Sequence, residues 1–236
     1  MTPVALYVHV PFCRAICRYC DFARQVRTEA DVERYLHALR IELERLGQTT
    51  PRTVYVGGGT PTALEVDELS RILQLITGAI EVARVEEFTV EGNPGTLTPD
   101  KFAAMRDCGV SRMSLGVQSF QPRLLELLGR IHSEAQARSA VADARAAGFT
   151  NLSIDLMHGL PDETREELAA DLAAAIDAAP EHISAYGLSY EEGTPLKDSL
   201  ERGVLKRLNP VEEAAQYQLV MERLVGAGFE QYEISN

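Results

Sequence analysis

Residues 7–22 read YVHVPFCRAICRYCDF, a short apolar run followed at once by Cys13, Cys17 and Cys20. The spacing is C-x3-C-x2-C, so three thiols lie within eight residues of chain. A 4Fe-4S cluster normally takes four cysteine ligands, one for each iron. With three cysteines one iron keeps an open position, by the same logic that leaves a position open at catalytic zinc. The stretch therefore predicts a 4Fe-4S cluster that can bind and reduce a further molecule.

Two other interpretations of these cysteines stay open. The first is zinc with His9 as a fourth ligand, although zinc knuckles usually pair their ligands as C-x2-C and supply a second pair downstream, which is missing here. The second is three ordinary buried cysteines, which does not explain why they crowd into a polar, arginine-containing loop. Cys108 stands apart and is predicted to be a small buried hydrophobe near a helix end.

Strands and helices are expected to alternate along the chain. The expected strands are 7–10, which is predicted to be buried, 53–56, 88–90, 112–117, 151–157 and 183–188, and the expected helices include 32–46, 69–78 and 210–225. The second of these helices is predicted to bury Leu69, Ile72, Leu73 and Ile76 and to end near Gly78. Helix N-caps are predicted at Thr98, Thr164 and Asn209. Such alternation predicts a parallel sheet. Cysteines, glycines or polar residues that could bind a ligand follow each strand in turn. In a barrel all the strand ends face one cavity, whereas an open sheet has a single ligand crevice. This distribution therefore favours a barrel.

Composition narrows the partners and the compartment. The net charge of -12 argues against a nucleic-acid surface. No apolar run approaches the ~20 residues of a membrane span, and the N-terminus lacks the pattern of a signal peptide. Bunched cysteines do not form a secreted disulfide framework, so the sequence predicts a reduced, cytoplasmic protein.

The sequence resembles the radical S-adenosylmethionine (SAM) enzymes, which carry C-x3-C-x2-C after a first strand. Within them it resembles the branch of oxygen-independent coproporphyrinogen III oxidases and HemW-type haem chaperones. The matching segments are YVHVPFC, YCDF, GGGTPT, EGNP, SLGVQSF, IDLMHGLP and YEISN, which together span nearly the whole chain. The oxidases carry another cysteine two positions after the third. This chain has Phe22 there, as in the chaperone branch.

The resemblance implies an α/β fold, an incomplete (β/α)6 TIM-like barrel of the radical SAM type, over residues 1–236. It implies a 4Fe-4S cluster and SAM as cofactors, an electron donor protein as partner, and a role in porphyrin and haem metabolism. The chaperone branch lacks coproporphyrinogen oxidase activity; the alternative is an oxidase that decarboxylates coproporphyrinogen III by radical chemistry. Family members continue into a C-terminal domain that this chain lacks, so haem and a haem-acceptor protein are expected of a longer form.

The resemblance also assigns the site. Cys13, Cys17 and Cys20 are the metal ligands. The positions that match SAM contacts are Tyr7, Tyr19, Gly58, Gly59, Thr60, Glu91, Gln118, Arg130 and Asp155. Residue chemistry agrees at several of them: glycines let a backbone approach a ligand, an arginine fork clamps a carboxylate, and a carboxylate in an apolar strand should be paired or bound. No side chain is assigned a catalytic role of its own.

Overall fold

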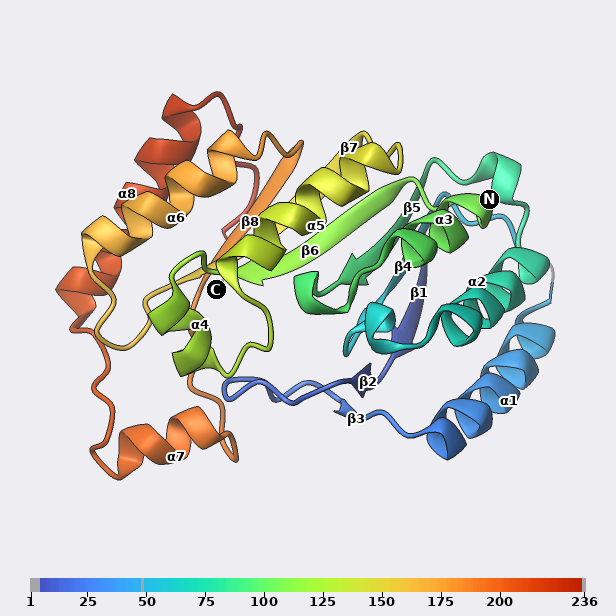
Figure 1. Ribbon diagram of the computed structural model, residues 1–236, viewed down its shortest axis with the longest axis horizontal. Coiled ribbons are helices and arrows are strands. Elements are labelled where there is room, and N and C mark those ends of the chain that lie inside the picture. The colour runs from blue at the N-terminus through green and yellow to red at the C-terminus, as the bar shows by residue number, and fades with distance from the viewer. Residues whose placement is uncertain (1–4, 48, 235–236) are drawn as a thin grey trace. The chain divides into compact units, whose positions relative to one another are not determined.

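The computed structural model describes residues 5–47 and 49–234 (Figure 1). The strands are β1 Ala5–Val10, β2 Phe12–Cys13, β3 Gln25–Val26, β4 Thr53–Gly58, β5 Glu87–Gly92, β6 Arg112–Gln118, β7 Asn151–His158 and β8 His182–Gly187. Six of them form one sheet in the order β1-β4-β5-β6-β7-β8. The order follows the chain from first to last and never reverses, so the sheet has no switch point of the doubly wound kind. The predicted barrel-like α/β fold is confirmed.

Helices follow the strands. They are α1 Glu29–Leu46, α2 Val66–Ala79, α3 Pro99–Asp107, α4 Pro122–Leu128, α5 Glu134–Ala146, α6 Arg165–Asp177, α7 Pro195–Glu201 and α8 Pro210–Gly226. The predicted caps are present: the side chains of Thr98, Thr164 and Asn209 each accept a hydrogen bond from a backbone N–H of the first turn. The short helices α4 and α7 were not predicted.

The described residues divide into two compact units. The first holds residues 5–16, 22–114 and 142–151, and the second holds 17–21, 115–141 and 152–234. Cys13 therefore belongs to the first unit, whereas Cys17 and Cys20 belong to the second. The last two residues of the YEISN segment, 235 and 236, lie outside the described residues.

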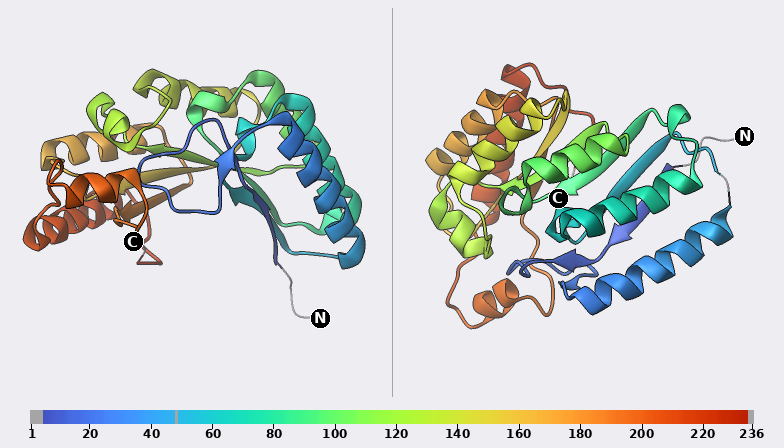
Figure 2. Two further views of the ribbon diagram at one scale, coloured as in Figure 1. Left: turned by 90° about the horizontal axis from the view of Figure 1, so that it is seen from below. Right: turned by 45° about the vertical axis from the view of Figure 1, so that its right-hand side comes forward.

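In the first unit, α1 and α2 lie side by side (Figure 2). The helix α2 buries the apolar stripe that the sequence predicted: Leu69, Ile72, Leu73 and Ile76. It runs to Ala79, one residue past Gly78, near which the sequence predicted its end. The strand β1 is less buried than expected, because the side chain of Tyr7 is 56% exposed.

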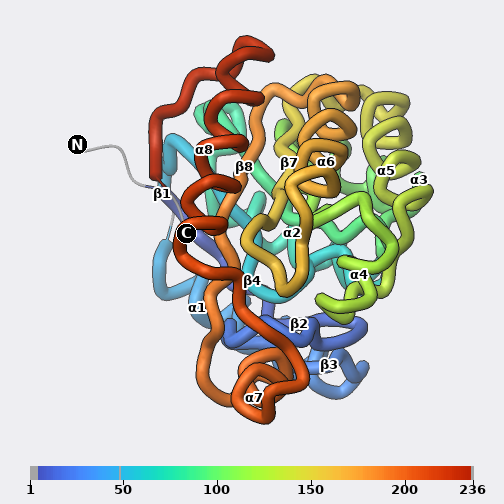
Figure 3. Tube along the Cα trace, turned by 90° about the vertical axis from the view of Figure 1, so that its left-hand side faces the viewer, coloured from blue at the N-terminus to red at the C-terminus, as the bar shows by residue number. Residues whose placement is uncertain are grey.

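In the second unit, α6 and α8 lie side by side (Figure 3). A core cluster is made of Leu124, Leu128, Met157, Leu160, Leu188 and Leu196. Tyr19 packs against this cluster. This apolar contact holds the segment between Cys17 and Cys20 against the core of the second unit, because burial of an aromatic ring is a large stabilising contribution.

Candidate functional site

The glycine run 57–59, at the end of β4, packs closely against the start of the cysteine loop. The backbone N–H of Gly59 donates to the carbonyl oxygen of Val10 at 2.8 Å, and that of Thr60 donates to Phe12 at 2.7 Å. A Cβ at Gly59 would lie 2.8 Å from the carbonyl oxygen of Phe12. The Thr60 hydroxyl oxygen is 3.8 Å from the Cys13 Sγ. The glycines are thus needed for packing inside the protein, whatever ligand they also meet.

Glu91, near the end of β5, is held by two donors in the first unit. The Tyr55 hydroxyl donates to its Oε1 at 2.7 Å, and the backbone N–H of Gly58 donates to its Oε2 at 3.1 Å. Burial raises the pKa of Glu91, and these two hydrogen bonds oppose the shift. The arrangement fixes an acceptor group next to the glycine run.

Tyr7 and His9, both on β1, form a polar pair in the first unit. The His9 Nε2 is 2.7 Å from the carbonyl oxygen of Ala23, and a carbonyl can only accept. In a neutral imidazole the Nδ1 is then the acceptor, and it lies 3.1 Å from the Tyr7 hydroxyl. Both ring nitrogens of His9 are engaged within the protein, which argues against His9 as a zinc ligand.

In the second unit, the backbone of Arg18 anchors the cysteine segment through two hydrogen bonds. Its backbone N–H donates to Leu128 at the end of α4, and its carbonyl accepts from Leu196 in α7, both at 2.9 Å. The helix α4 ends at Gly129 in the left-handed conformation, with a φ of 70°. A Cβ at Gly129 would lie 2.8 Å from the Arg18 side chain, so glycine permits this approach.

Arg130 aims its guanidinium at the same segment. Its Nη1 donates to the Cys17 Sγ at 3.3 Å and lies 3.5 Å from the Tyr19 hydroxyl, and its Nη2 donates to the carbonyl of Gly116. Its Nε is buried without a partner in the described part of the chain. Burial and the neighbouring thiols of Cys17 and Cys20 raise the pKa of Tyr19. Arg130 thus places a cation beside the Cys17 sulfur.

Gln118 and Tyr186 form a second polar pair in this unit. Gln118 ends β6 with a φ of 68°, in the left-handed region, where a side chain other than glycine costs of order 1–3 kcal/mol. The Tyr186 hydroxyl on β8 donates to the Gln118 Oε1 at 2.6 Å. Burial is the main cause that raises the pKa of Tyr186, and the negative charge of Asp155 adds to it. Asp155 therefore lies near Tyr186, on the neighbouring strand.

The structure thus gathers the expected residues in two sets. Tyr7, Cys13, Gly58, Gly59, Thr60 and Glu91 belong to the first unit; Cys17, Tyr19, Cys20, Gln118, Arg130 and Asp155 belong to the second. Across the described residues, no group of three His, Cys, Asp or Glu side chains is placed to hold a metal ion. The ligand role of the three cysteines stays a prediction.

Sequence reasoning missed two members of these sets, Tyr55 and Tyr186. Both lie on strands, where tyrosine is common for packing alone, so nothing marked their hydroxyls as partners of Glu91 and Gln118. The pairing of neighbouring strands is the feature that could have pointed to these two tyrosines. Tyr55 pairs with Thr89 two residues before Glu91, and Tyr186 pairs with Met157 two residues after Asp155.

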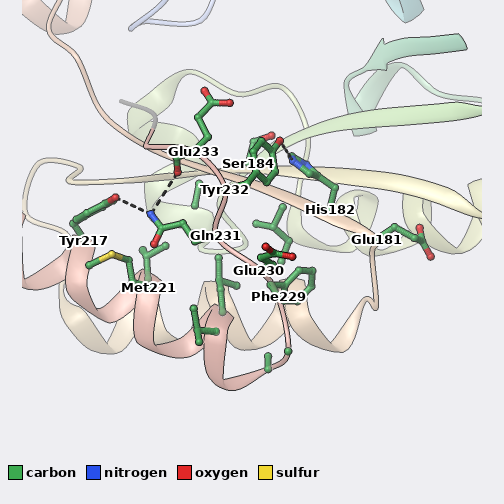
Figure 4. A pocket seen from close by; sticks show the side chains of 17 residues that line it. Glu181, His182, Ser184, Tyr217, Met221, Phe229, Glu230, Gln231, Tyr232 and Glu233 are labelled. Atoms are coloured by element: carbon green, nitrogen blue, oxygen red, sulfur yellow. Dashed lines mark hydrogen bonds between the residues drawn. The ribbon is translucent and has the colours of Figure 1, made fainter. Parts of the chain in front are cut away.

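The second unit also contains a cavity of about 550 Å³ between β8, α8 and the segment that follows α8 (Figure 4). His182 lies in its wall with both ring nitrogens occupied, by the hydroxyls of Ser153 at 2.8 Å and Tyr232 at 2.7 Å. None of the expected cofactor residues lines this cavity.

A comparison with family models matches residues 7–175 to the radical SAM superfamily. The match covers well over half of the chain and includes all three clustered cysteines.

The chain belongs to the radical SAM superfamily.

Relatives place this radical SAM chain near one group. It is 41% identical over 241 residues to the heme chaperone HemW of Mycobacterium tuberculosis strain H37Rv, covering 99% of this chain and 62% of the relative. It is 37% identical over 235 residues to HemW of Bacillus subtilis, covering 98% and 62%. The radical SAM chain therefore spans less than two thirds of the length of these curated relatives.

Solved structures agree on the fold. The chain resembles coproporphyrinogen III oxidase (HemN) from Escherichia coli with a TM-score of 0.88 and 26% identity, covering 99% of this chain and 55% of that one. Iron–sulfur and SAM binding are typical of the radical SAM superfamily. Within the described residues, no helix is long and apolar enough to cross a membrane.

Proposed function

We propose that this chain is the cluster- and SAM-binding part of a haem chaperone of the HemW type. The observation that carries the proposal is the likeness to HemW over 99% of the chain, at 41% identity in the Mycobacterium tuberculosis relative. Phe22 adds to it. Its side chain is 65% exposed, and it replaces the additional cysteine that the resembled oxidases carry at this position.

Cys13, Cys17 and Cys20 would hold the cluster. None of the three forms a disulfide within the described residues; Cys13 is buried, and Cys17 and Cys20 are half-buried. Three thiols in a short loop, one of them accepting from a guanidinium, are a donor set that suits a 4Fe-4S cluster with one open iron. A bound cluster supplies the electron for reductive cleavage of SAM. The protein's part is to position the cofactors and to exclude water.

Each unit contains polar groups that suit parts of SAM. The Arg130 guanidinium suits the SAM carboxylate, because its buried Nε has no partner within the described residues and can donate to a carboxylate oxygen. The carboxylates of Glu91 and Asp155 suit the SAM ammonium or ribose hydroxyls. Tyr55 and Gly58 keep Glu91 fixed before SAM arrives, so less side-chain freedom is lost on binding.

The whole protein would act beyond this part. By analogy with the HemW relatives, it would bind haem and deliver it to an acceptor protein in the cytoplasm, and an electron donor protein would reduce its cluster. The runner-up function is oxidative decarboxylation of coproporphyrinogen III, which the likeness to HemN favours. Phe22 argues against it.

Anaerobic reconstitution with iron and sulfide, followed by calorimetric titration with SAM, tests the cofactor part of this proposal. A brown protein that binds SAM with one site per chain supports it. Stoichiometric zinc without iron uptake would refute it. In the same titration Arg130→Lys should bind SAM more weakly, and Arg123→Lys is its control, because Arg123 pairs with Glu167 and has no role in the proposed site.

A further inference from the structure

Gln118 lies at the centre of a tight three-residue turn. The backbone N–H of Ser119 donates to the carbonyl oxygen of Val117 at 2.9 Å, and Gln118 between them has a φ of 68°. A hydrogen bond between residues i and i+2, with a positive φ at the residue between them, defines the classic γ-turn, which is rare and strained. Such a turn persists only where its surroundings hold it.

Asp171 on α6 accepts a hydrogen bond from each of the three residues that follow Gln118. Its Oδ2 accepts from the Ser119 hydroxyl at 2.5 Å. Its Oδ1 accepts from the backbone N–H of Phe120 at 2.9 Å and from the Gln121 side-chain amide at 2.8 Å. The Asp171 side chain is buried, and burial raises its pKa while these donors oppose the shift. Three donors converge on one buried carboxylate, which is the way such a group is normally satisfied.

We propose that Asp171 is a positioning residue for SAM binding: it fixes the turn that aims the Gln118 side chain. The inference rests on the proposed function and on the resemblance, which assigns Gln118 to the SAM contacts. Tyr186 fixes the other end of the same side chain by donating to Oε1 at 2.6 Å, which leaves the amide N–H groups of Gln118 as donors for a ligand. Asp171 thus fixes the backbone turn at Gln118, and Tyr186 fixes the end of the Gln118 side chain.

A purely structural role for Asp171 makes a different prediction. If the carboxylate only stabilised the second unit, its loss would lower the melting temperature and leave the SAM affinity of the folded protein unchanged. If it positions Gln118, its loss lowers the affinity of folded protein, and the effect disappears once the Gln118 side chain is removed. Coupling of this kind is what a double-mutant cycle measures.

The experiment uses the full chain with its cluster reconstituted. The variants are Asp171→Asn, which keeps the shape of the side chain, Gln118→Ala, and the two combined. Asp177→Asn is the matched control, because Asp177 is an exposed carboxylate on the same helix. SAM affinity is measured by calorimetry, and the geometry of the turn is measured on the same samples from the amide-to-Hα coupling of Gln118 and from hydrogen exchange at Ser119 and Phe120.

We expect Asp171→Asn to weaken SAM binding about tenfold and to speed exchange at Ser119 and Phe120, with iron content and the control unchanged. In the Gln118→Ala background Asp171→Asn should have no further effect on affinity. Equal losses in both backgrounds, or an unchanged affinity with a loosened turn, would overturn the positioning role. If Asp171→Asn does not fold, Ser119→Ala removes one of the three donors and must show a smaller loss of the same pattern.

Wild-type protein separates this inference from the proposed function. If iron-loaded wild type does not bind SAM, the proposed function has failed, and the turn measurements alone then decide whether Asp171 fixes Gln118. If wild type binds SAM and Asp171→Asn binds equally well, the proposed function stands and the inference has failed.

Discussion

Gly59 lies so close to Phe12 that a Cβ on Gly59 would be 2.8 Å from the Phe12 carbonyl oxygen and 2.9 Å from its nitrogen. Both atoms are backbone and cannot turn aside as a flexible side chain would. We therefore expect Gly59→Ala to push the start of the cysteine loop away from β4, to destabilise the protein by roughly 1–3 kcal/mol and to lower iron incorporation. Chemical unfolding and iron analysis measure the two effects.

Gly78→Ala is the matched control for this glycine. Gly78 lies inside α2, and nothing would lie within 4 Å of its Cβ. Alanine in a helix interior should stabilise the protein by about 0.5–1 kcal/mol with iron content unchanged. A Gly59→Ala protein as stable and iron-rich as wild type would mean that the loop yields easily, and the packing argument would be wrong.

The three clustered cysteines are expected to hold iron. Anaerobically reconstituted protein should contain ~4 iron per chain and absorb as a brown chromophore. Cys13→Ser, Cys17→Ser and Cys20→Ser should each abolish the colour, since a serine oxygen is a poor replacement for a thiolate in such a cluster. Cys108→Ser is the control, because Cys108 lies at the end of α3 outside the loop. Loss of iron in this control as well would point to a folding defect instead of lost ligands.

Arg130 is expected to act on SAM without being needed for the cluster. Arg130→Lys keeps the charge and loses the planar fork that reaches Cys17, Tyr19 and Gly116. We expect SAM affinity to fall at least about tenfold, or about 1.4 kcal/mol, in protein that keeps its iron. Calorimetric titration checks this, with Arg123→Lys as control. Unchanged affinity would remove Arg130 from the SAM site.

Periodicity and capping signals predicted most of the fold because they act locally. The stripe from Leu69 to Ile76 and the caps at Thr98 and Thr164 are each set within one helix. The short helix α4 escaped notice because seven residues carry too little periodicity to separate a helix from a turn. The end of α2, expected near Gly78, is confirmed to within one residue, since the helix runs to Ala79.

The site was less visible because its contacts join distant residues. Arg130 reaches Cys17 across 113 positions, and Asp171 reaches Ser119 across 52. Gln118 was expected to bind a ligand, but no local pattern announced its positive φ, since glutamine is an unusual residue there. The chain could be assigned its cofactor residues by resemblance alone. The groups that hold those residues needed the structure.

Glu163 should make stability depend on pH in a defined direction. It is buried, and burial raises its pKa from an ordinary value of 4.5 to about 8. Unfolded chains lose this proton near pH 4.5, whereas the folded protein keeps it to about pH 8. Over that window the folded state binds more protons, so Glu163 makes the free energy of unfolding fall as pH rises.

Glu163→Gln removes this dependence because the amide is neutral throughout. Relative to wild type, the variant should gain little at pH 4.5 and roughly 3–5 kcal/mol by pH 8. Urea unfolding at several pH values measures the difference. Glu166→Gln, at an exposed position on α6, is the control for exchange of a glutamate. A Glu163→Gln curve parallel to wild type would show that the Glu163 carboxyl is ionised in the folded protein.

The last prediction concerns the reaction. Phe22 offers no thiol to a polar cofactor or substrate, at the position where the resembled oxidases carry a cysteine. We expect no conversion of coproporphyrinogen III to protoporphyrinogen IX by this chain, even with the cluster, a reductant and SAM present. Chromatography of the porphyrin products measures this, and HemN from Escherichia coli serves as the active reference.

A longer form that includes the C-terminal domain of the family completes this test. We expect the longer form to bind haem more tightly than residues 1–236, as followed by absorbance titration, because the resemblance to the chaperone branch implies a histidine motif for haem in that domain. Turnover of coproporphyrinogen III by either form would move the assignment to the oxidases. Equally tight haem binding by the short chain would place the haem ligand within these residues. His158 is then the first to substitute, since both of its ring nitrogens are buried without a partner in the described structure. His182→Ala is its control, because Ser153 and Tyr232 already occupy both nitrogens of His182.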